Sequence, residues 1–281
     1  TLIPISRVSV GFGSGGGDYG KTGQSFGGGS AAGVKIDPVA FLVIKDGSTR
    51  VLPVAVPPTS TMERIVENHP EAVTLLGVQY RMNEHIMKFS SDWFYGGKVQ
   101  TAPEVKNRGI LDYDEPMQWI DTSLTGAKEE FVGESFGRIN KQEAQLTIDT
   151  LRSYYAKIGR TRALDERIDV GVISPYRAQV QYLRQLIRRD DELRPLRRLI
   201  TVNTVDGFQG QERDVIIISL VRANDDGQIG FLSDLRRMNV AITRARMKLI
   251  ILGNAATMTK HGFYKKLFQF CGHDDEALTE V

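Results

Sequence analysis

Disulfides, membrane spans and a strong net charge are all lacking in this chain of 281 residues. Cys271 is the only cysteine, so no disulfide can form within the chain, and a reducing, cytoplasmic setting is the default expectation. Apolar runs such as Val215 to Ile218 are far shorter than the about 20 residues that a membrane helix needs, so no membrane partner is expected. The net charge is only +2, which neither indicates nor excludes nucleic-acid binding, because a groove needs only local charge.

Glycine is abundant near the start of the chain. The stretch GGGDYGKT, residues 15–22, matches the phosphate-loop pattern G-x-x-x-x-G-K-[ST]. Such a loop needs a helix behind it, because the helix N-terminus and the loop N–H groups hold the phosphates. Lys21 and Thr22 are instead followed by GQSFGGGSAAG, where each glycine costs about 1 kcal/mol of helix propensity. We therefore interpret the match as accidental, and a self-contained phosphate-loop ATPase that uses Lys21 is the weakest alternative for function.

Residues 1–60 carry few charges and several short β-prone runs, such as Ala40 to Ile44 and Arg50 to Leu52. The pair Asp46-Gly47 between these runs favours a hairpin turn, because both residues tolerate positive φ. A small glycine-rich β-module is therefore expected. The stretches ISRVSVGFGSGGGDYG, FGGGSAAGVKIDPVAFLVIKDG and VLPV resemble the sporulation protein family called GerW or YtfJ. This resemblance implies that GGGDYGKT is an internal glycine loop of a β-rich module.

From about residue 61 onward, predicted helices and strands alternate, and we expect one α/β domain over 61–281. Continuous apolar runs are typical of strands buried on both faces of a parallel sheet that helices cover. Apolar residues three and four apart predict the helices. We expect helices over 63–70, 83–94, 141–157 and 176–189, and strands over 168–173, 199–202, 215–221 and 249–252.

Four segments with polar and aromatic residues lie near the ends of these predicted strands. VQYRMNEHI precedes a helix, ISPYRAQV follows a strand, and NTVDGFQGQERD connects two strands. RRMNVAITRAR is expected to be a helix with two arginines, Arg244 and Arg246, at its end. Ligands of doubly wound sheets bind beyond the carboxyl ends of the strands. We therefore expect all four segments to meet at one edge of the sheet.

The ordered motifs resemble the second RecA-like domain of superfamily 1 helicases, in the Upf-like branch that includes the nonsense-mediated-decay helicase and its bacterial relatives. The resemblance covers about residues 59–270. It implies a P-loop NTPase fold, with a RecA-like parallel sheet flanked by helices, and it implies an ATP-dependent DNA or RNA helicase that uses ATP with Mg²⁺ and binds single-stranded DNA or RNA. The segments that carry it are QYRMNEHIMKFSSDWFYGGKV, VGVISPYRAQV, TVDGFQGQERDVIIISLVRAN and GFLSDLRRMNVAITRARMKLIILGN.

The resemblance also implies roles for residues at the ATP cleft. Arg244 and Arg81 match the two arginine fingers, whose positive charge meets the γ-phosphate as negative charge spreads in the transition state. Tyr80 matches the aromatic residue that stacks on adenine. Gln209 and Glu212 match positions that couple the cleft to nucleic acid and approach the ribose. Without the ordered motifs, the same residues could simply be packing aromatics and solvated charges.

Three further residues match positions that contact the nucleic-acid strand in the family. Thr204 matches a hydroxyl that holds the backbone, and Ser174 and Tyr176 lie where relatives also contact the strand. A hydroxyl at a helix N-terminus suits a phosphate. No metal ligands are expected in this chain, since Cys271-Gly272-His273 is too sparse a cluster.

The family's first RecA-like domain, which holds the phosphate loop and the acidic Mg²⁺ motif, is not visible in this sequence. The interval between Thr22 and Gln79 is too short for it. We therefore expect the Mg²⁺ ligands to come from a first RecA-like domain in cis or in trans, and this chain alone to be inactive. The join between the two halves is expected between Pro53 and Met62. Two alternatives stay open, a non-catalytic nucleic-acid-binding module and a sporulation-associated structural protein.

Overall fold

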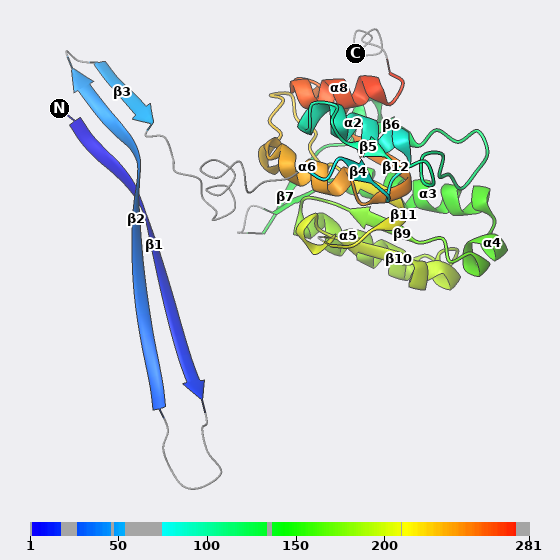
Figure 1. Ribbon diagram of the computed structural model, residues 1–281, viewed down its shortest axis with the longest axis horizontal. Coiled ribbons are helices and arrows are strands. Elements are labelled where there is room, and N and C mark those ends of the chain that lie inside the picture. Colours follow the sequence, from blue (N-terminus) through cyan, green and yellow to red (C-terminus); the bar gives the residue numbers. More distant parts are fainter. Residues whose placement is uncertain are drawn as a thin grey trace, which may run out of the picture. The chain divides into compact units, whose positions relative to one another are not determined.

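The computed structural model describes residues 2–17, 27–45, 48–53, 75–133, 137–208 and 210–273, and of the first three ranges only the backbone. The chain forms two compact units, Thr1–Leu75 and Leu76–Val281 (Figure 1). The domain boundary that the sequence suggests, near residue 60, stays a prediction. Among the described residues, no helix has both the length and the apolar character that crossing a bilayer requires.

The first unit contains an antiparallel sheet in which β1 (Leu2–Gly17) pairs with β2 (Gly27–Lys45), and β2 pairs with β3 (Ser48–Pro53). Lys45 lies opposite Ser48, so the predicted hairpin is confirmed, although its turn at residues 46–47 lies outside the described residues. The first glycines of GGGDYGKT are part of β1, while residues 18–26, Lys21 among them, also lie outside the described residues. The chain after the pattern forms strand β2 from Gly27 onward, which agrees with an accidental match.

The second unit is built on a parallel five-stranded sheet with the order β10-β9-β11-β12-β6. Its three central strands, β9, β11 and β12, are buried on both faces, as their continuous apolar runs predict, and all five strands run parallel. Strand β6 was not expected, because its short sequence MQWID lacks a continuous apolar run. The strands are β6 (Met117–Asp121), β9 (Val170–Ile173), β10 (Ile200–Asn203), β11 (Arg213–Ser219) and β12 (Ala245–Gly253).

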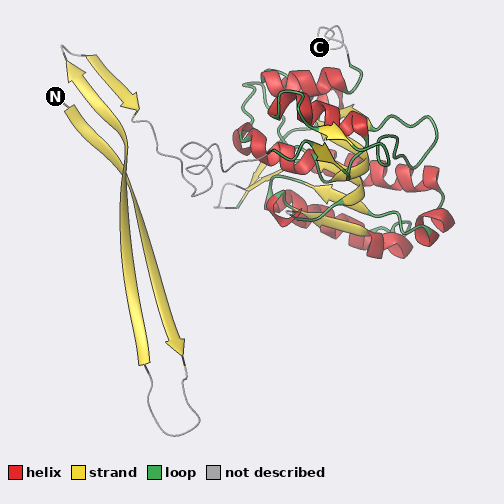
Figure 2. Ribbon diagram, in the orientation of Figure 1, coloured by secondary structure: helices red, strands yellow, loops and turns green. Residues whose placement is uncertain are grey.

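Helices cover both faces of this sheet, as Figure 2 shows. Helices α2, α6 and α8 contribute Phe89, Met238 and Phe263 to the core on one face, and α3 and α5 contribute Leu151 and Leu183 to the core on the other. The expected parallel sheet flanked by helices is thereby confirmed. The helices are α2 (Glu84–Phe94), α3 (Lys141–Ile158), α4 (Arg160–Asp165), α5 (Arg177–Arg189), α6 (Leu235–Ile242), α7 (Ala255–Met258) and α8 (Gly262–Phe270).

Short elements complete the second unit. β4 (Val78–Gln79) and β5 (Gln100–Thr101) form a parallel pair, and β7 (Glu130–Val132) and β8 (Gly137–Ile139) form an antiparallel pair. The 3-10 helices are η2 (Ser123–Thr125), η3 (Arg194–Leu199), η4 (Asp206–Phe208) and η5 (Gly230–Ser233).

The helix expected over 63–70 lies outside the described residues. Two other expected boundaries are wrong, the end of the helix in RRMNVAITRAR and the end of the strand expected over 215–221. The helix in RRMNVAITRAR ends at Ile242, and Arg246 belongs to β12. The chain extends here because Ala245 pairs with Arg213 in the sheet. Strand β11 ends at Ser219, because Val221 adopts a left-handed φ of 72° that a strand cannot contain.

The predicted site residues are divided between the two edges of the parallel sheet. Ser174 follows β9 and Thr204 follows β10, so both lie where strands end, at the carboxyl edge. Glu212 precedes β11 and Arg244 precedes β12, so both lie at the opposite, amino edge, and Arg81 contacts Glu212 there. The expectation that all four segments meet at one edge is wrong. Because β10 and β11 run parallel, the connection between them must cross from the carboxyl edge to the amino edge, so its first and last residues lie at different edges.

That connection, residues 204–212, crosses the sheet over β9. Phe208 is fully buried in the same core as α2, α6 and α8. A Cβ added to Gly171 of β9 would lie 2.8 Å from the Phe208 ring and 2.7 Å from Ile216 Cδ1. Glycine at position 171 therefore leaves the space into which the Phe208 ring packs, and this packing anchors the connection.

Candidate functional site

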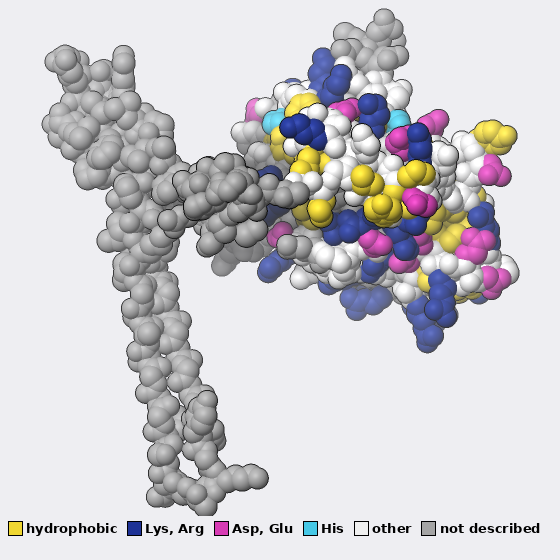
Figure 3. Space-filling view, in the orientation of Figure 1, with side chains coloured by type: hydrophobic (Ala, Val, Ile, Leu, Met, Phe, Trp, Pro, Cys, Tyr) yellow, Lys and Arg dark blue, Asp and Glu magenta, His cyan; other side chains and the backbone are white. Residues whose placement is uncertain are grey.

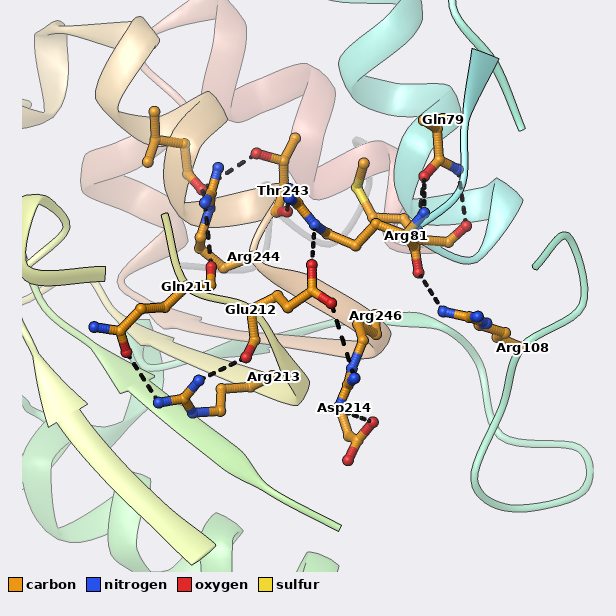
Figure 4. Close-up of polar contacts among 12 residues, drawn as sticks. Gln79, Arg81, Arg108, Gln211, Glu212, Arg213, Asp214, Thr243, Arg244 and Arg246 are labelled. Carbon is orange, nitrogen blue, oxygen red and sulfur yellow. Dashed lines mark hydrogen bonds and ion pairs between the residues drawn. The ribbon is translucent and has the colours of Figure 1, made fainter. Parts of the chain in front are cut away.

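A cluster of charged residues at the amino edge brings together three of the predicted site residues (Figure 4). Arg81 Nε donates to the carboxylate of Glu212, and an Arg81 Nη1 donates to the Thr243 carbonyl at 3.2 Å. Arg244 follows Thr243 in the chain, and Arg246 Nη1 lies 3.8 Å from Glu212 Oε1. We call Arg81, Glu212, Arg244 and Arg246 the arginine cluster.

The side chain of Gln79 fixes the loop that carries Arg81. Gln79 Oε1 accepts hydrogen bonds from the backbone N–H groups of Arg81 at 2.8 Å and Met82 at 2.7 Å. Its Nε2 donates to the Met82 carbonyl at 2.9 Å and to the Thr101 hydroxyl at 2.8 Å. Arg108 donates to the Arg81 carbonyl at 3.1 Å. The backbone from which the Arg81 side chain extends is therefore held from several sides, as Figure 4 shows.

Arg244 lies in the turn between α6 and β12, and its guanidinium contacts backbone carbonyls. Nε donates to Val240 at 3.0 Å and Nη1 to Gln211 at 3.1 Å. In the part of the chain that the structure describes, no carboxylate forms an ion pair with Arg244. Burial, and next the nearby charge of Arg81, lower the pKa of the Arg244 guanidinium, while Glu212 acts in the opposite direction. Arg244 is thus a partly buried cation beside a second cation.

Arg246 is neutralised, in contrast to Arg244. Its Nη2 lies 2.9 Å from Asp214 Oδ1 and 3.5 Å from Asp169 Oδ1. Burial raises the pKa of the Asp214 carboxyl, while hydrogen bonding to the Asp169 backbone and the charge of Arg246 lower it. Arg246 therefore fastens the start of β12 to its neighbours, and this is a structural role.

Tyr80 precedes Arg81 and presents its ring to solvent, with 65% of the residue exposed. An exposed aromatic ring beside a group of cations offers a flat apolar face next to a site for negative charge. The amino edge can thus accept an anion at Arg244 and Arg81 and a planar group at Tyr80.

The predicted nucleic-acid residues lie at the carboxyl edge with different exposure. Ser174 is fully buried, and its hydroxyl has no hydrogen-bond partner among the described residues. Tyr176 precedes α5 and is buried, and its hydroxyl accepts from Arg222 Nη1 at 3.3 Å. Thr204 is half-buried, and its hydroxyl accepts from the Gly207 N–H at 3.4 Å. Thr204 is therefore the most accessible of the three predicted contacts.

Gln209, also expected at the cleft, lies outside the described residues. The structure adds two residues to which the sequence reasoning gave no role, Gln79 and Arg246. Gln79 is the first residue of the QYR motif, and its side-chain amide can both donate and accept hydrogen bonds. The ion pairs of Arg246 are with Asp169 and Asp214, which are distant in sequence, so no local signal could have revealed them.

One face of the second unit does not form a single basic field. On the face seen in Figure 3, basic and acidic side chains are interspersed. On this face, attraction for a polyanion must therefore come from local groups.

Two family models match the chain. Residues 58–256 match a family described as an AAA domain, which is more than half of the chain. Residues 1–74 match the family described as sporulation protein YtfJ, which confirms the resemblance of the first unit.

Several curated proteins are similar to this chain. An uncharacterized ATP-dependent helicase of Methanocaldococcus jannaschii is 36% identical, with 76% of this chain and 31% of the relative covered. The DNA polymerase alpha-associated DNA helicase A of Saccharomyces cerevisiae is 35% identical, with 76% and 33% covered. The DNA-binding protein SMUBP-2 of Rattus norvegicus is 34% identical, with 78% and 22% covered. The chain thus spans about a fifth to a third of the length of these relatives.

Among solved structures, the C-terminal domain of a possible DNA helicase from Lactobacillus plantarum is similar with a TM-score of 0.36 and 13% identity. The comparison covers 63% of this chain and 88% of that one.

The parallel sheet, the ordered motifs and the family match define the second unit as a helicase domain of the P-loop NTPase fold. The chain belongs to the AAA-domain family, and its second unit is a second RecA-like domain of the superfamily 1 helicase type.

Proposed function

We propose that the second unit is the C-terminal motor domain of an ATP-dependent DNA or RNA helicase. In this proposal Arg81 and Arg244 are arginine fingers for the γ-phosphate of an ATP that a first RecA-like domain holds. Tyr80 stacks on the adenine and Glu212 approaches the ribose, while Gln209 couples the cleft to the nucleic acid. The proposal takes the ATP and nucleic-acid activity of the whole protein from helicases that are much longer than this chain.

The observation that carries the proposal is the setting of Arg244. Its guanidinium is partly buried, lies near the like charge of Arg81 and lacks a carboxylate partner among the described residues. Burial and the like charge of Arg81 disfavour a cation, and an anion that arrives at the amino edge would offset them. Phosphate oxygens fit, because a guanidinium can donate two parallel N–H groups to them.

The residues of this domain would act by holding positive charge in a fixed geometry. Bound ATP supplies the phosphoryl group and carries Mg²⁺, whose ligands the family resemblance assigns to the first RecA-like domain. Gln79 fixes the backbone of Arg81, and Glu212 orients its guanidinium. A phosphate would therefore have to compete with the Glu212 carboxylate for Arg81, whereas it could bind Arg244 without a competing carboxylate.

We place the single-stranded DNA or RNA at the carboxyl edge, on the accessible Thr204 and on the loop 174–176, in which Pro175 is partly exposed while Ser174 and Tyr176 are buried. The connection 204–212 then joins this edge to Glu212 in the arginine cluster. ATP hydrolysis at the amino edge and strand binding at the carboxyl edge would then both involve the connection 204–212, which the packing of Phe208 holds in place.

A second candidate function belongs to the first unit alone. Its match to sporulation protein YtfJ supports a sporulation-associated structural role for residues 1–74. If this role were the function of the whole chain, changes in the arginine cluster would have no effect on it. Localisation of the chain to the spore, unaltered by Arg244→Ala, would favour this candidate.

ATP hydrolysis by the chain alone and by the chain supplied with a first RecA-like domain tests the motor proposal. We expect negligible turnover alone and turnover stimulated by single-stranded DNA or RNA in the completed enzyme. Robust turnover by the chain alone that Lys21→Ala abolishes would contradict it, as would a completed enzyme whose turnover does not depend on Arg244.

A further inference from the structure

A hollow of about 490 Å³ opens at the carboxyl edge, and Tyr176 is the one expected site residue in its lining. This volume lies in the range of about 300–1,000 Å³ that is usual for small-ligand sites. The hollow lies between β7–β8, the start of α5, the chain after β11 and η5. We call it the Phe131–Phe231 hollow, and the residues that the argument uses are Phe131, Arg138, Tyr176, Arg222, Phe231 and Arg237.

Two phenylalanines line this hollow with most of their surface exposed. Phe131 is 66% exposed and Phe231 is 63% exposed. A single exposed apolar side chain is ordinary, but two exposed aromatic rings in one concave site mark a surface that offers flat apolar faces to a ligand.

The ring of Phe231 is positioned by tight backbone packing. Gly230 has φ +56°, and a Cβ there would lie 2.4 Å from Arg222 Nη1 and 3.1 Å from the Tyr176 hydroxyl. Because position 230 has no side chain, the η5 turn can lie against Arg222 and Tyr176. The ring centroids of Tyr176 and Phe231 are 5.8 Å apart, so the exposed Phe231 ring rests on a buried one.

The second ring is backed by a guanidinium. Arg138 Cζ lies 4.1 Å from the centroid of the Phe131 ring, and Arg138 also forms an ion pair with Glu129. Glu129 in addition pairs with the buried Arg222 at 2.7 Å. The guanidinium and ring planes thus form a preordered stack, which costs less entropy on ligand binding than a free side chain would.

Arg237 supplies accessible positive charge at this hollow. Its side chain is 52% exposed, and its ion pairs with Asp234 and Asp206 are long, at 3.6 Å and 3.8 Å. A screened, half-exposed pair of this kind is weak and can exchange its carboxylate for a phosphate.

A smaller hollow beside it is lined by Pro175 and Thr204 and shares Phe231 and Arg237 with the Phe131–Phe231 hollow. Phe231 therefore belongs to the same lining as Thr204, the residue on which the strand is proposed to lie.

We propose that the Phe131–Phe231 hollow is a stacking subsite for a base of single-stranded nucleic acid. A base lies on the exposed ring of Phe231, within reach of Phe131 and its stacked Arg138, while Arg237 meets the adjoining phosphate. This inference rests on the proposed function, which assigns the strand to the carboxyl edge, and it adds that the strand is held by its bases as well as its backbone. Stacking accepts any base, so binding is tolerant of sequence but requires unpaired bases.

The test measures, by fluorescence anisotropy, how tightly the full-length protein chain binds two probes of equal length. One probe is a short oligodeoxythymidine, and the other is the same phosphodiester backbone with abasic sites. Stacking contributes about 1–3 kcal/mol per base, which corresponds to about a 5- to 150-fold change in affinity. We expect wild type to bind the base-bearing probe about tenfold more tightly than the abasic one. Phe231→Ala should lose this preference, Phe131→Ala should reduce it, and Phe231→Tyr should retain it.

Tyr113→Ala is the matched control, since Tyr113 is a fully exposed aromatic residue that precedes β6 at the amino edge. It should bind both probes as wild type does. Thermal unfolding checks each variant, and if Phe231→Ala unfolds early, Phe231→Leu keeps the apolar volume without the aromatic ring and must lose the preference.

The two proposals fail in different ways. Phe131 and Phe231 variants that keep the wild-type preference for the base-bearing probe would overturn the stacking subsite and leave the strand at the carboxyl edge. A wild-type chain that binds neither probe, even at low salt, would overturn the proposed strand edge and the subsite with it.

Discussion

Arg244 and Arg81 belong to one cluster, yet they differ in what binds them. Arg81 is oriented by Glu212, whereas Arg244 contacts only carbonyl oxygens among the described residues. An incoming phosphate must compete with a carboxylate at Arg81 but not at Arg244. The larger share of phosphate recognition is therefore expected from Arg244.

In an enzyme completed with a first RecA-like domain, Arg244→Ala should lower kcat by about 10²- to 10⁴-fold with a modest change in KM. Arg244→Lys should rescue poorly, because an ammonium lacks the planar pair of donors. Strand affinity should change little, since Arg244 lies at the amino edge. Steady-state ATPase kinetics and anisotropy measure the two effects, with Arg162→Ala, an exposed arginine paired with Glu166, as the control. Equal losses of turnover and strand affinity would mean that Arg244 only holds the Gln211 backbone.

A second residue-scale feature is the buried carboxyl of Glu143, which belongs to the first turn of α3. Its Oε1 accepts from the Ser219 hydroxyl at 2.6 Å and from the Val221 N–H at 2.7 Å. Oε2 has no partner among the described residues. Burial raises the pKa of Glu143 from 4.5 to about 7, although these hydrogen bonds act to lower it.

This pKa predicts a pH dependence of stability. The folded state binds the Glu143 proton more tightly than the unfolded state, so the stabilisation is complete below pH 4.5 and is lost as pH rises toward about 7. The loss is about 3 kcal/mol at about 1.4 kcal/mol per pH unit. Urea unfolding across this window should show it in wild type but not in Glu143→Gln, with exposed Glu130→Gln as the control. A wild-type curve parallel to that of Glu143→Gln would contradict the raised pKa.

At the scale of elements, the connection 204–212 depends on one glycine. Gly171→Ala places a methyl group 2.7–2.8 Å from Ile216 and the Phe208 ring. Overpacking of this kind costs about 1–3 kcal/mol, so the melting temperature should fall and strand affinity should fall with the displaced connection. Gly262→Ala is the control, because a Cβ there meets nothing within 4 Å. An unchanged melting temperature in Gly171→Ala would show that Phe208 is not anchored there.

The elements themselves were largely predictable from sequence, because their signals are local. Ala144, Ile148, Leu151 and Tyr155 recur at helical spacing and are all buried in α3. The division of the motifs between two edges follows from the predicted parallel sheet, because residues that precede a parallel strand lie at the edge opposite those that follow one. The Arg81–Glu212 pair, which joins residues far apart in sequence, has no local signal.

At the scale of the whole molecule, the two hydrophobic cores that flank the parallel sheet consist, among the described residues, of side chains of the second unit. Residues 76–281 should therefore fold alone, with the thermal unfolding transition of the full chain and the same strand affinity. Differential scanning calorimetry and anisotropy with the truncated and full chains check this expectation. A truncated chain that fails to unfold cooperatively would show that the first unit contributes to the stability of the second.

The anchored connection 204–212 also has a thermodynamic consequence. In the proposed function it is the segment shared between strand binding at Thr204 and nucleotide binding at Glu212, so its conformation would enter the binding free energy of both ligands. Linkage is reciprocal: whatever factor a bound nucleotide applies to strand affinity, the strand must apply to nucleotide affinity. Titrating each ligand alone and at saturating levels of the other should therefore give the same coupling factor for the nucleotide and for the strand. A substitution that loosens the packing of Phe208 should reduce both coupling factors together.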